Sequence, residues 1–317
     1  MKLDLKDRKI LYELDTDARQ SNSEIAKKVG LNKNTVNYKI SRMTEEGIIT
    51  GYYTVVDSSK LGYFSIRVYL KFRNTESKKE DEIINWLRKQ KFIGVVGKIE
   101  TVYDLAFIAY IKDIYEWEEV WREFKRKFRK YFWDEHVSIF SRVYHYKRKY
   151  LLEGEKTLSR DFETIGGKEI VKFDELDLKI LGVLSESARI PLIEISEKLK
   201  ADDRTIAARI KQLEQKKIIQ GYRVKLALEK IGYEYYKINF KLNECANYDK
   251  IFSFCENHLN VIYIDETLGD LDFEIDVEVR NRQELLALIH DLKNRFDIRD
   301  TEILNFKEYL KLESLPR

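Results

Sequence analysis

The chain carries one stretch of sequence twice, and this repeat limits the folds that are open to it. Residues 4–63 align with residues 174–233 without a gap, and 20 of the 60 aligned positions are identical. The identities form short clusters, such as Gly51-Tyr52 with Gly221-Tyr222. Two copies that share this much sequence are expected to form two similar structural units.

The repeat continues past residue 63 with weaker similarity. Asp104-Leu105-Ala106-Phe107 matches Asp270-Leu271-Asp272-Phe273 at an offset of 166 instead of 170, which predicts that copy 2 has lost four residues in between. The join between the copies, Leu151–Lys172, is polar and contains three glycines. We therefore expect it to be a linker.

The start of copy 1 contains three short helical patterns. Apolar residues recur at helical spacing, at Ile10, Leu11 and Leu14 in the first pattern and at Val36, Ile40 and Met43 in the third. Ser21–Glu24 has the spacing of a capping box and opens the second helix, which Gly30 ends, and Asn32 is placed to cap the third. Two helices joined by a tight turn are typical of a helix-turn-helix, whose second helix enters the major groove of DNA.

The remainder of each copy has the pattern β-α-β-β-α-β, which is the ferredoxin-like arrangement. In copy 1 the expected elements are strands 65–73, 93–102, 103–111 and 137–146 and helices 80–88 and 115–132. We predict an α+β fold with two winged helix-turn-helix domains, each followed by a ferredoxin-like βαββαβ domain. The expected boundaries are 1–62, 63–150, a linker at 151–172, 173–232 and 233–317.

The composition is that of globular domains. Its 58 basic and 55 acidic residues give a net charge of +3, which neither requires nor excludes a polyanionic partner. Cys245 and Cys255 show no metal-ligand spacing with each other or with the four histidines, so no metal or other cofactor is expected and the thiols suit a reducing cytoplasm. No apolar run approaches 18 residues, so no membrane partner is expected.

The outward face of the third helix offers side chains that suit double-stranded DNA. Asparagine can pair with adenine through two hydrogen bonds, and lysine or arginine can reach guanine or phosphate. A solvated polar face is the alternative, against which the surrounding helix-turn-helix pattern weighs. The candidate DNA-binding residues are Lys33, Asn34, Thr35, Asn37, Tyr38, Lys39, Ser41 and Arg42.

Copy 2 differs at the same positions. Ala207 and Ala208 lack hydrogen-bonding reach, and Asp203 would face phosphates unfavourably. Copy 2 is therefore expected either to bind the DNA backbone with little base readout or not to bind. Its candidate DNA-binding residues are Arg204, Thr205, Arg209 and Lys211.

Taken in order, these motifs resemble those of the Lrp/AsnC family of transcription regulators, over nearly the whole of each copy. The resemblance rests on Leu5-x-Asp7-x-x-Ile10-Leu11-x-x-Leu14, Ala18-Arg19, Glu24-Ile25-Ala26-x-x-Val29-Gly30-Leu31, Thr35-Val36-x-x-x-Ile40, Gly47-Ile48-Ile49-x-Gly51-Tyr52 and Leu61-Gly62-Tyr63. It implies that each βαββαβ unit is an effector-sensing, oligomerising RAM domain. It also implies a homo-oligomer, such as a dimer, and regulation by an amino acid or a related small molecule.

The resemblance further implies where an effector would bind. In the family a Gly-Asp-x-Asp stretch between the second and third strands of the RAM domain lies near the effector, and Gly269, Asp270 and Asp272 match it. In copy 1 the aligned residues 103–106 lack the glycine and the second aspartate, and Tyr103 is expected to fill the place of the glycine. A plain hairpin turn explains the same residues equally well.

Copy 2 also carries an acidic row, formed by Asp272, Glu274, Asp276 and Glu278 at alternate positions of one strand. Such a row suits a metal or a cationic ligand. A solvated or ion-paired face is the expected alternative, because Lys237 and Lys241 lie on the neighbouring strand of a ferredoxin-like sheet.

Two other classes of protein share this overall pattern. Siroheme decarboxylases are enzymes that resemble this arrangement and are expected to carry Tyr, Arg and His where this chain has residues 97–107, a segment without Arg or His. A sensor that kept the fold without binding DNA is the third class. We therefore expect a cytoplasmic transcription regulator that is not an enzyme.

Overall fold

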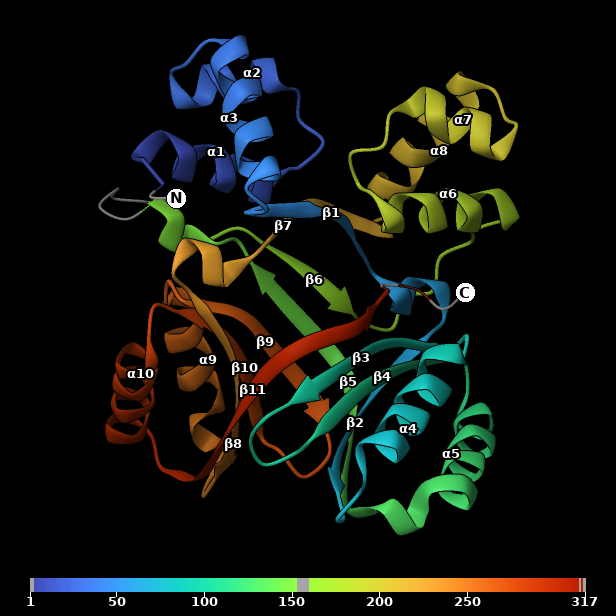
Figure 1. Ribbon diagram of the computed structural model, residues 1–317, viewed down its shortest axis with the longest axis vertical. Coiled ribbons are helices and arrows are strands. Elements are labelled where there is room, and N and C mark those ends of the chain that lie inside the picture. Colours follow the sequence, from blue (N-terminus) through green and yellow to red (C-terminus); the bar gives the residue numbers. More distant parts are fainter. Residues whose placement is uncertain (1–2, 153–159, 314, 316–317) are drawn as a thin grey trace.

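The computed structural model describes residues 3–152, 160–313 and 315. Figure 1 shows two helical heads above a body of strands and helices, and each copy of the repeat contributes one head and half of the body. We call residues 3–56 head 1 and residues 174–226 head 2. No helix in the described part of the chain is long and apolar enough to cross a membrane.

The sequence signals of head 1 produce the expected helices. Ser21 forms a capping box with Glu24, and the Asn32 side chain accepts a hydrogen bond from the backbone N–H of Thr35. The second helix ends at Gly30, whose φ of 66° lies in the left-handed region that glycine adopts without strain. Head 1 consists of α1 (Leu5–Thr16), α2 (Asn22–Val29), α3 (Lys33–Glu45) and β1 (Ile49–Val56).

Head 2 repeats this arrangement although its turn signals are weaker. Lys200 replaces Gly30 and still adopts the left-handed conformation, with a φ of 50°. Asp202 caps the third helix of head 2 as Asn32 caps the third helix of head 1. Head 2 consists of α6 (Glu175–Glu186), α7 (Leu192–Leu199), α8 (Asp203–Gln215) and β7 (Ile219–Leu226).

The body is a closed β-barrel that both copies build together. The strand order is β2-β4-β3-β11-β8-β10-β9-β5, and β5 closes the ring by pairing with β2. All the pairings are antiparallel. The two βαββαβ units therefore pack together within one chain.

Each half of the barrel carries two helices on its outer side (Figure 1). The main apolar core of each half includes side chains of these helices, such as Phe124 in copy 1 and Leu288 in copy 2. Alternate strand residues therefore point into the barrel.

Copy 1 contributes β2 (Phe64–Phe72), α4 (Ser77–Lys89), β3 (Ile93–Ile99), β4 (Leu105–Ile111), α5 (Ile114–Phe128) and β5 (Phe132–Tyr146). Copy 2 contributes β8 (Glu234–Leu242), α9 (Tyr248–Asn257), β9 (Val261–Leu268), β10 (Phe273–Val279), α10 (Arg282–Arg295) and β11 (Ile298–Leu312). Short 3-10 helices lie at Ser58–Leu61, Arg129–Tyr131, Lys149–Leu152, Leu228–Ile231 and Cys245–Asn247.

The segment expected to be a linker contains an ordered strand, β6 (Phe162–Gly166), which pairs with β5. The Arg160 guanidinium donates hydrogen bonds to backbone carbonyls of Glu256 and His258. Gly166 has a φ of 118°, and a Cβ atom at this position would lie 2.4 Å from the Ser141 carbonyl oxygen. The described part of this segment is therefore fixed to the body by hydrogen bonds.

The strand register corrects the sequence alignment of the two barrel halves. Leu105 and Phe273 occupy the same place, because each pairs with the seventh residue of the neighbouring strand, β2 or β8. The offset here is 168 and not 166, so Asp104 corresponds to Asp272 and not to Asp270. Each of these two equivalent carboxylates accepts a hydrogen bond of 2.7 Å from the backbone N–H of the last residue of that neighbouring strand.

Candidate nucleic-acid interface

The face of α3 that points away from head 1 is built by the spacing of its apolar residues. Val36, Ile40 and Met43 are buried in the head, which turns the intervening polar residues outward. Lys33, Asn34, Tyr38 and Ser41 are exposed, and Asn37 is half-buried. In the described structure the side chains of Lys33, Asn34 and Ser41 form no hydrogen bond or ion pair, so they are available to an external partner.

Several of the candidate residues in copy 1 have an internal partner instead. The Asn37 side-chain oxygen accepts a hydrogen bond of 2.6 Å from the Asn22 amide, and the Arg42 guanidinium lies 6.0 Å from the centre of the Tyr38 ring. The Lys39 ammonium lies 2.8 Å from the buried Asp7 carboxylate and 2.7 Å from Asp4. The Arg42 guanidinium lies 3.0 Å from the same Asp7. Because these ion pairs fasten α3 to α1, Lys39 and Arg42 hold α3 in place within head 1, which the sequence did not reveal. The Thr35 backbone is held by the cap at Asn32.

Copy 2 repeats the internal ion pair and differs on its outer face. Arg209, at the position of Lys39, contacts Asp174 at 2.7 Å and Asp177 at 3.3 Å. The exposed face of α8 carries Arg204, Thr205, Lys211, Asp203, Ala207 and Ala208. Two cations therefore share this face with one carboxylate and two methyl groups.

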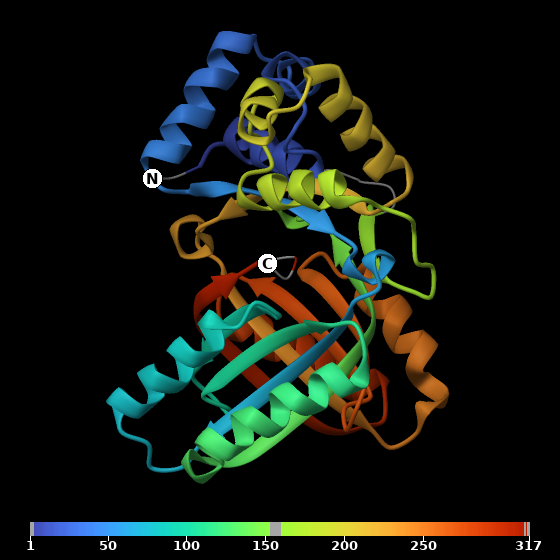
Figure 2. The same ribbon diagram turned by 90° about the vertical axis from the view of Figure 1, so that its right-hand side faces the viewer.

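The two heads are joined to each other along a pseudo-twofold axis. β1 and β7 pair antiparallel, and Tyr53 lies opposite Arg223, its own equivalent in the repeat. On one side of this axis the Arg19 guanidinium lies over the Tyr222 ring at 5.4 Å, and on the other the Arg189 guanidinium lies over Tyr52 at 5.2 Å. These reciprocal contacts fix α3 and α8 relative to each other, and the two helices flank the head pair on opposite sides (Figure 2).

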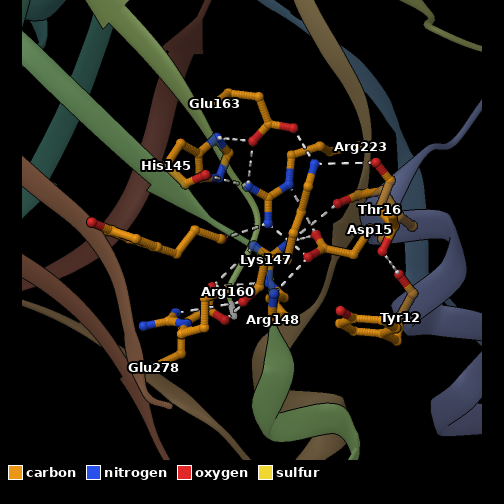
Figure 3. A network of polar contacts seen from close by, with 12 residues as sticks. Tyr12, Asp15, Thr16, His145, Lys147, Arg148, Arg160, Glu163, Arg223 and Glu278 are labelled. Atoms are coloured by element: carbon orange, nitrogen blue, oxygen red, sulfur yellow. Dashed lines mark hydrogen bonds and ion pairs between the residues drawn. The ribbon is translucent and has the colours of Figure 1, made fainter. Parts of the chain in front are cut away.

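Head 1 is connected to the body by a buried ionic network (Figure 3). The Asp15 carboxylate, at the end of α1, accepts hydrogen bonds of 2.7 Å from both Arg148 and Arg223. Arg148 also pairs with Glu278 on β10 at 2.9 Å, and Arg223 pairs with Glu163 on β6 at 3.3 Å. Burial alone would raise the pKa of Asp15, but the two guanidinium groups lower it to about 2. The network therefore joins head 1, the strand of head 2, the barrel and β6.

Head 2 lacks the equivalent network. At the positions of Asp15 and Arg223 the other copy has Ser185 and Tyr53, and Tyr110 occupies the place of Glu278. Burial and the nearby guanidinium groups lower the pKa of His145, which stacks against Tyr263, well below its usual value. The sequence contains a sign of this network, because the residues that form it differ together between the two copies. The sequence alone could not show that these residues contact one another, because they lie far apart along the chain.

The predicted effector residues lie at one end of the barrel. One of their carboxylates is used within the barrel and the other is exposed to solvent. Asp272 caps the end of β8, as described above, so its carboxylate serves the strand. Asp270 is 83% exposed, and one of its oxygens lies 3.6 Å from Nδ1 of His136 on β5 of the other copy. The copy 1 equivalent of Gly269 is Thr101, and Tyr103 corresponds to Leu271. The expectation that Tyr103 replaces the glycine, and that copy 1 lacks the second aspartate, is therefore wrong.

Polar side chains meet inside the barrel beside this loop. Tyr69 and His136 pair across β2 and β5 and their rings stack at 6.1 Å. Within the described structure the Tyr69 hydroxyl, Nε2 of His136 and the Ser138 hydroxyl are buried without a hydrogen-bond partner. Buried polar atoms are usually satisfied, so these three groups stand out as hydrogen-bonding groups that the described residues leave unpaired.

The acidic row of copy 2 is buried and ion-paired along most of its length. Arg67 from copy 1 contacts Glu274 directly and lies 3.0 Å from Asp265. The Lys237 ammonium lies 2.6 Å from Asp265 and 2.9 Å from Asp276. In the described residues no group of three or more His, Cys, Asp and Glu side chains is placed to hold a metal ion. The expectation that this row is ion-paired is confirmed. Its cationic partners are Lys237 of copy 2, as expected, and also Arg67 of copy 1.

Comparison with known proteins identifies the family. The family model described as winged helix-turn-helix DNA-binding matches residues 3–50 and 173–220. The HTH-type transcriptional regulator LrpA of Pyrococcus horikoshii is 39% identical over 130 residues, which cover 39% of this chain and 88% of that protein. This chain belongs to the Lrp/AsnC family. It is a tandemly duplicated member, because the family model matches it twice.

Of two further comparisons, one agrees with this assignment and the other concerns the fold alone. The HTH-type transcriptional regulator Ptr1 of Methanocaldococcus jannaschii is 34% identical to this Lrp/AsnC regulator over 115 residues, covering 35% of this chain and 74% of Ptr1. The crystal structure of the siroheme decarboxylase NirDL covers 98% of this chain and 94% of its own, with a TM-score of 0.64 and 14% identity. The NirDL match shows that one fold spans both copies.

Proposed function

We propose that this Lrp/AsnC regulator controls transcription by binding double-stranded DNA through the outer face of α3, with α8 contacting the same duplex from the other side of the head pair. The observation that carries the proposal is the exposed face of α3, where Lys33, Asn34 and Ser41 have no internal partner within the described structure. Lysine supplies a phosphate or guanine contact, and asparagine suits adenine. The contacts between the heads support simultaneous approach of both helices to one duplex.

The test measures binding of the full chain to labelled promoter duplexes by fluorescence anisotropy across a series of salt concentrations. Affinity should fall steeply with salt, because each neutralised phosphate releases counterions. Lys33→Ala should reduce the slope of log affinity against log salt by about 1. The matched control is Lys250→Ala, an exposed lysine on α9 of the body, which should leave the slope unchanged. Equal effects of the two substitutions would contradict the proposed interface.

We further propose an effector site at the end of the barrel, around Gly269 and Asp270 of copy 2 and His136 of copy 1. The exposed Asp270 carboxylate can hold an ammonium group through charge-assisted hydrogen bonds, and the unpartnered hydroxyl of Tyr69 supplies a second polar contact. An amino acid or a related amine carries the required ammonium group. The site differs from the sequence expectation because Asp272 is engaged in capping β8.

Calorimetric titration with the twenty amino acids tests the effector site. Asp270→Asn should abolish the heat of binding, whereas Asp249→Asn, an exposed aspartate on α9, should not. Asp272→Asn is unsuitable as a probe, because it removes a hydrogen bond of the strand. Absence of heat with every amino acid would leave the chain a regulator without this class of effector.

One observation favours an enzyme as the second candidate function. Arg, Tyr and His do meet in this chain, at Arg67, Tyr69 and His136 inside the barrel, although none of them lies in residues 97–107. We propose that the chain is nevertheless not an enzyme, because its relatives are transcription regulators. An absorbance scan after mixing with an iron tetrapyrrole separates the two functions, and a shifted spectrum followed by loss of carboxylate would support the enzyme.

The assembly and the location of the chain are proposals on separate grounds. One chain already supplies both halves of the barrel, and a dimer of chains is proposed from the family alone. Light scattering at several concentrations tests it, and a mass of 38.0 kDa throughout would contradict it. We propose a cytoplasmic location, because double-stranded DNA is the proposed partner.

A further inference from the structure

The two recognition helices are held as a single DNA-facing unit. The equivalent residues Tyr53 and Arg223 lie opposite each other in the β1–β7 pair, which places the pseudo-twofold axis between the heads. The Arg19 side chain donates a hydrogen bond of 2.7 Å to the Ala188 carbonyl, and Arg189 donates one of 2.9 Å to the Asn22 side chain. A duplex that contacts both α3 and α8 would therefore meet them in related orientations and present two half-sites in inverted order.

The two helices offer different chemistry to these half-sites. At the four exposed or half-exposed positions of the first two turns, α3 carries Lys33, Asn34, Asn37 and Tyr38, whereas α8 carries Asp203, Arg204, Ala207 and Ala208. Asparagine amides donate and accept hydrogen bonds with base edges, which distinguishes adenine from the other bases. An alanine methyl group can contact only the thymine methyl among base-edge groups.

The charged residues of α8 still suit the DNA backbone. Arg204 and Lys211 are exposed, and neither forms an ion pair in the described structure. Such cations hold phosphates without regard to sequence. Asp203 near the start of the helix weakens this attraction without removing it, because two cations remain against one carboxylate.

We infer that this regulator recognises an asymmetric operator. One half-site is read through its bases by α3, and the adjoining half-site is held through its phosphates by α8 with little preference for sequence. This inference rests on the proposed DNA binding and defines the kind of DNA that is bound. Each bidentate base contact of α3 should discriminate roughly 5- to 150-fold against the wrong base, whereas positions under α8 should discriminate only weakly.

The experiment selects bound duplexes from a randomised library with the full chain, and hydroxyl-radical footprinting then maps the contacts on a selected duplex. We expect base preference in one half-site and protection of the backbone in both. Asn34→Ala should remove preference at one position of the informative half-site. A palindromic preference of equal strength in both halves would overturn the inference while leaving the proposed function intact. No binding to any duplex at low salt would overturn both.

A graft between the helices provides the matched variants. Exchange of the four α8 residues for those of α3 gives Asp203→Lys, Arg204→Asn, Ala207→Asn and Ala208→Tyr, all at exposed positions where refolding is not at risk. The selected site should then become an inverted repeat of the original informative half. The reverse graft, Lys33→Asp, Asn34→Arg, Asn37→Ala and Tyr38→Ala, should flatten the preference while retaining salt-dependent binding. An unchanged selected site with both grafts would overturn the inference.

Discussion

Asp15→Asn tests whether the buried network holds head 1 on the body. Four hydrogen bonds reach the Asp15 carboxylate, two from Arg223, one from the Arg148 guanidinium and one from the Arg148 backbone N–H. Neither Asp15 nor Arg223 is accessible to solvent. The amide of asparagine keeps one acceptor and turns a donor toward a guanidinium group, so it leaves buried positive charge without compensation.

The size of the loss can be worked out in two ways. Removal of one partner of a buried ion pair destabilises by about 3–5 kcal/mol, and the low end applies because Arg148 keeps Glu278 and Arg223 keeps Glu163. Lowering the pKa of Asp15 from 3.8 to about 2 corresponds to about 2.5 kcal/mol at about 1.4 kcal/mol per pH unit. We therefore expect the free energy of unfolding to fall by about 2–3 kcal/mol.

Urea unfolding followed by circular dichroism measures this loss. The control is Glu118→Gln, which removes an exposed helical ion pair with Arg122 and should change the free energy by no more than about 0.5 kcal/mol. Because folding lowers the pKa of Asp15, its contribution is complete above about pH 4 and disappears as the pH falls toward 2. The difference between wild type and Asp15→Asn should shrink over that range. A loss no larger than that of Glu118→Gln at pH 7 would refute the reasoning.

Three single-residue substitutions test the local backbone geometry, each by the same urea unfolding followed by circular dichroism. Gly182→Ala lies in α6 with open space around the new Cβ and should stabilise by about 1 kcal/mol through helix propensity; a loss would mean that the helix packs differently. Lys200→Gly relieves a left-handed residue and should stabilise by up to about 1 kcal/mol, unless the turn opens in solution. Gly166→Ala forces a Cβ against the Ser141 carbonyl and should destabilise by about 1–3 kcal/mol; a neutral result would show that β6 is not held as described.

The helices of the heads could be predicted because their signals are local. Ser21, Asn32 and Gly30 act within one turn of the chain, and the buried apolar residues follow the helical period. The succession of strands and helices along each half of the body was predictable for the same reason. The closed barrel was harder to predict from the sequence, because hydrogen bonds between β3 and β11 and between β5 and β9 join residues that are far apart along the chain.

The candidate site was predicted only in part, because charge and exposure do not tell which partner a side chain chooses. Lys39 and Arg42 have the right chemistry for DNA, but the buried Asp7 on α1 engages both. Asp270 was aligned with Asp104 by the similarity of the following residues. Only the register of the strands shows that Asp104 is equivalent to Asp272.

The ion pairs inside the barrel have a consequence for how such a chain can change over generations. Arg67 and Lys237 stand at equivalent positions, so both copies present a cation, whereas Asp265, Glu274 and Asp276 all come from copy 2. In an assembly of two identical chains every substitution appears on both sides of the axis at once, and a new charge meets its own image. Fusion into one polypeptide removes that coupling. Each half can then acquire a residue that suits only its neighbour, and the two halves can specialise without losing one another as partners.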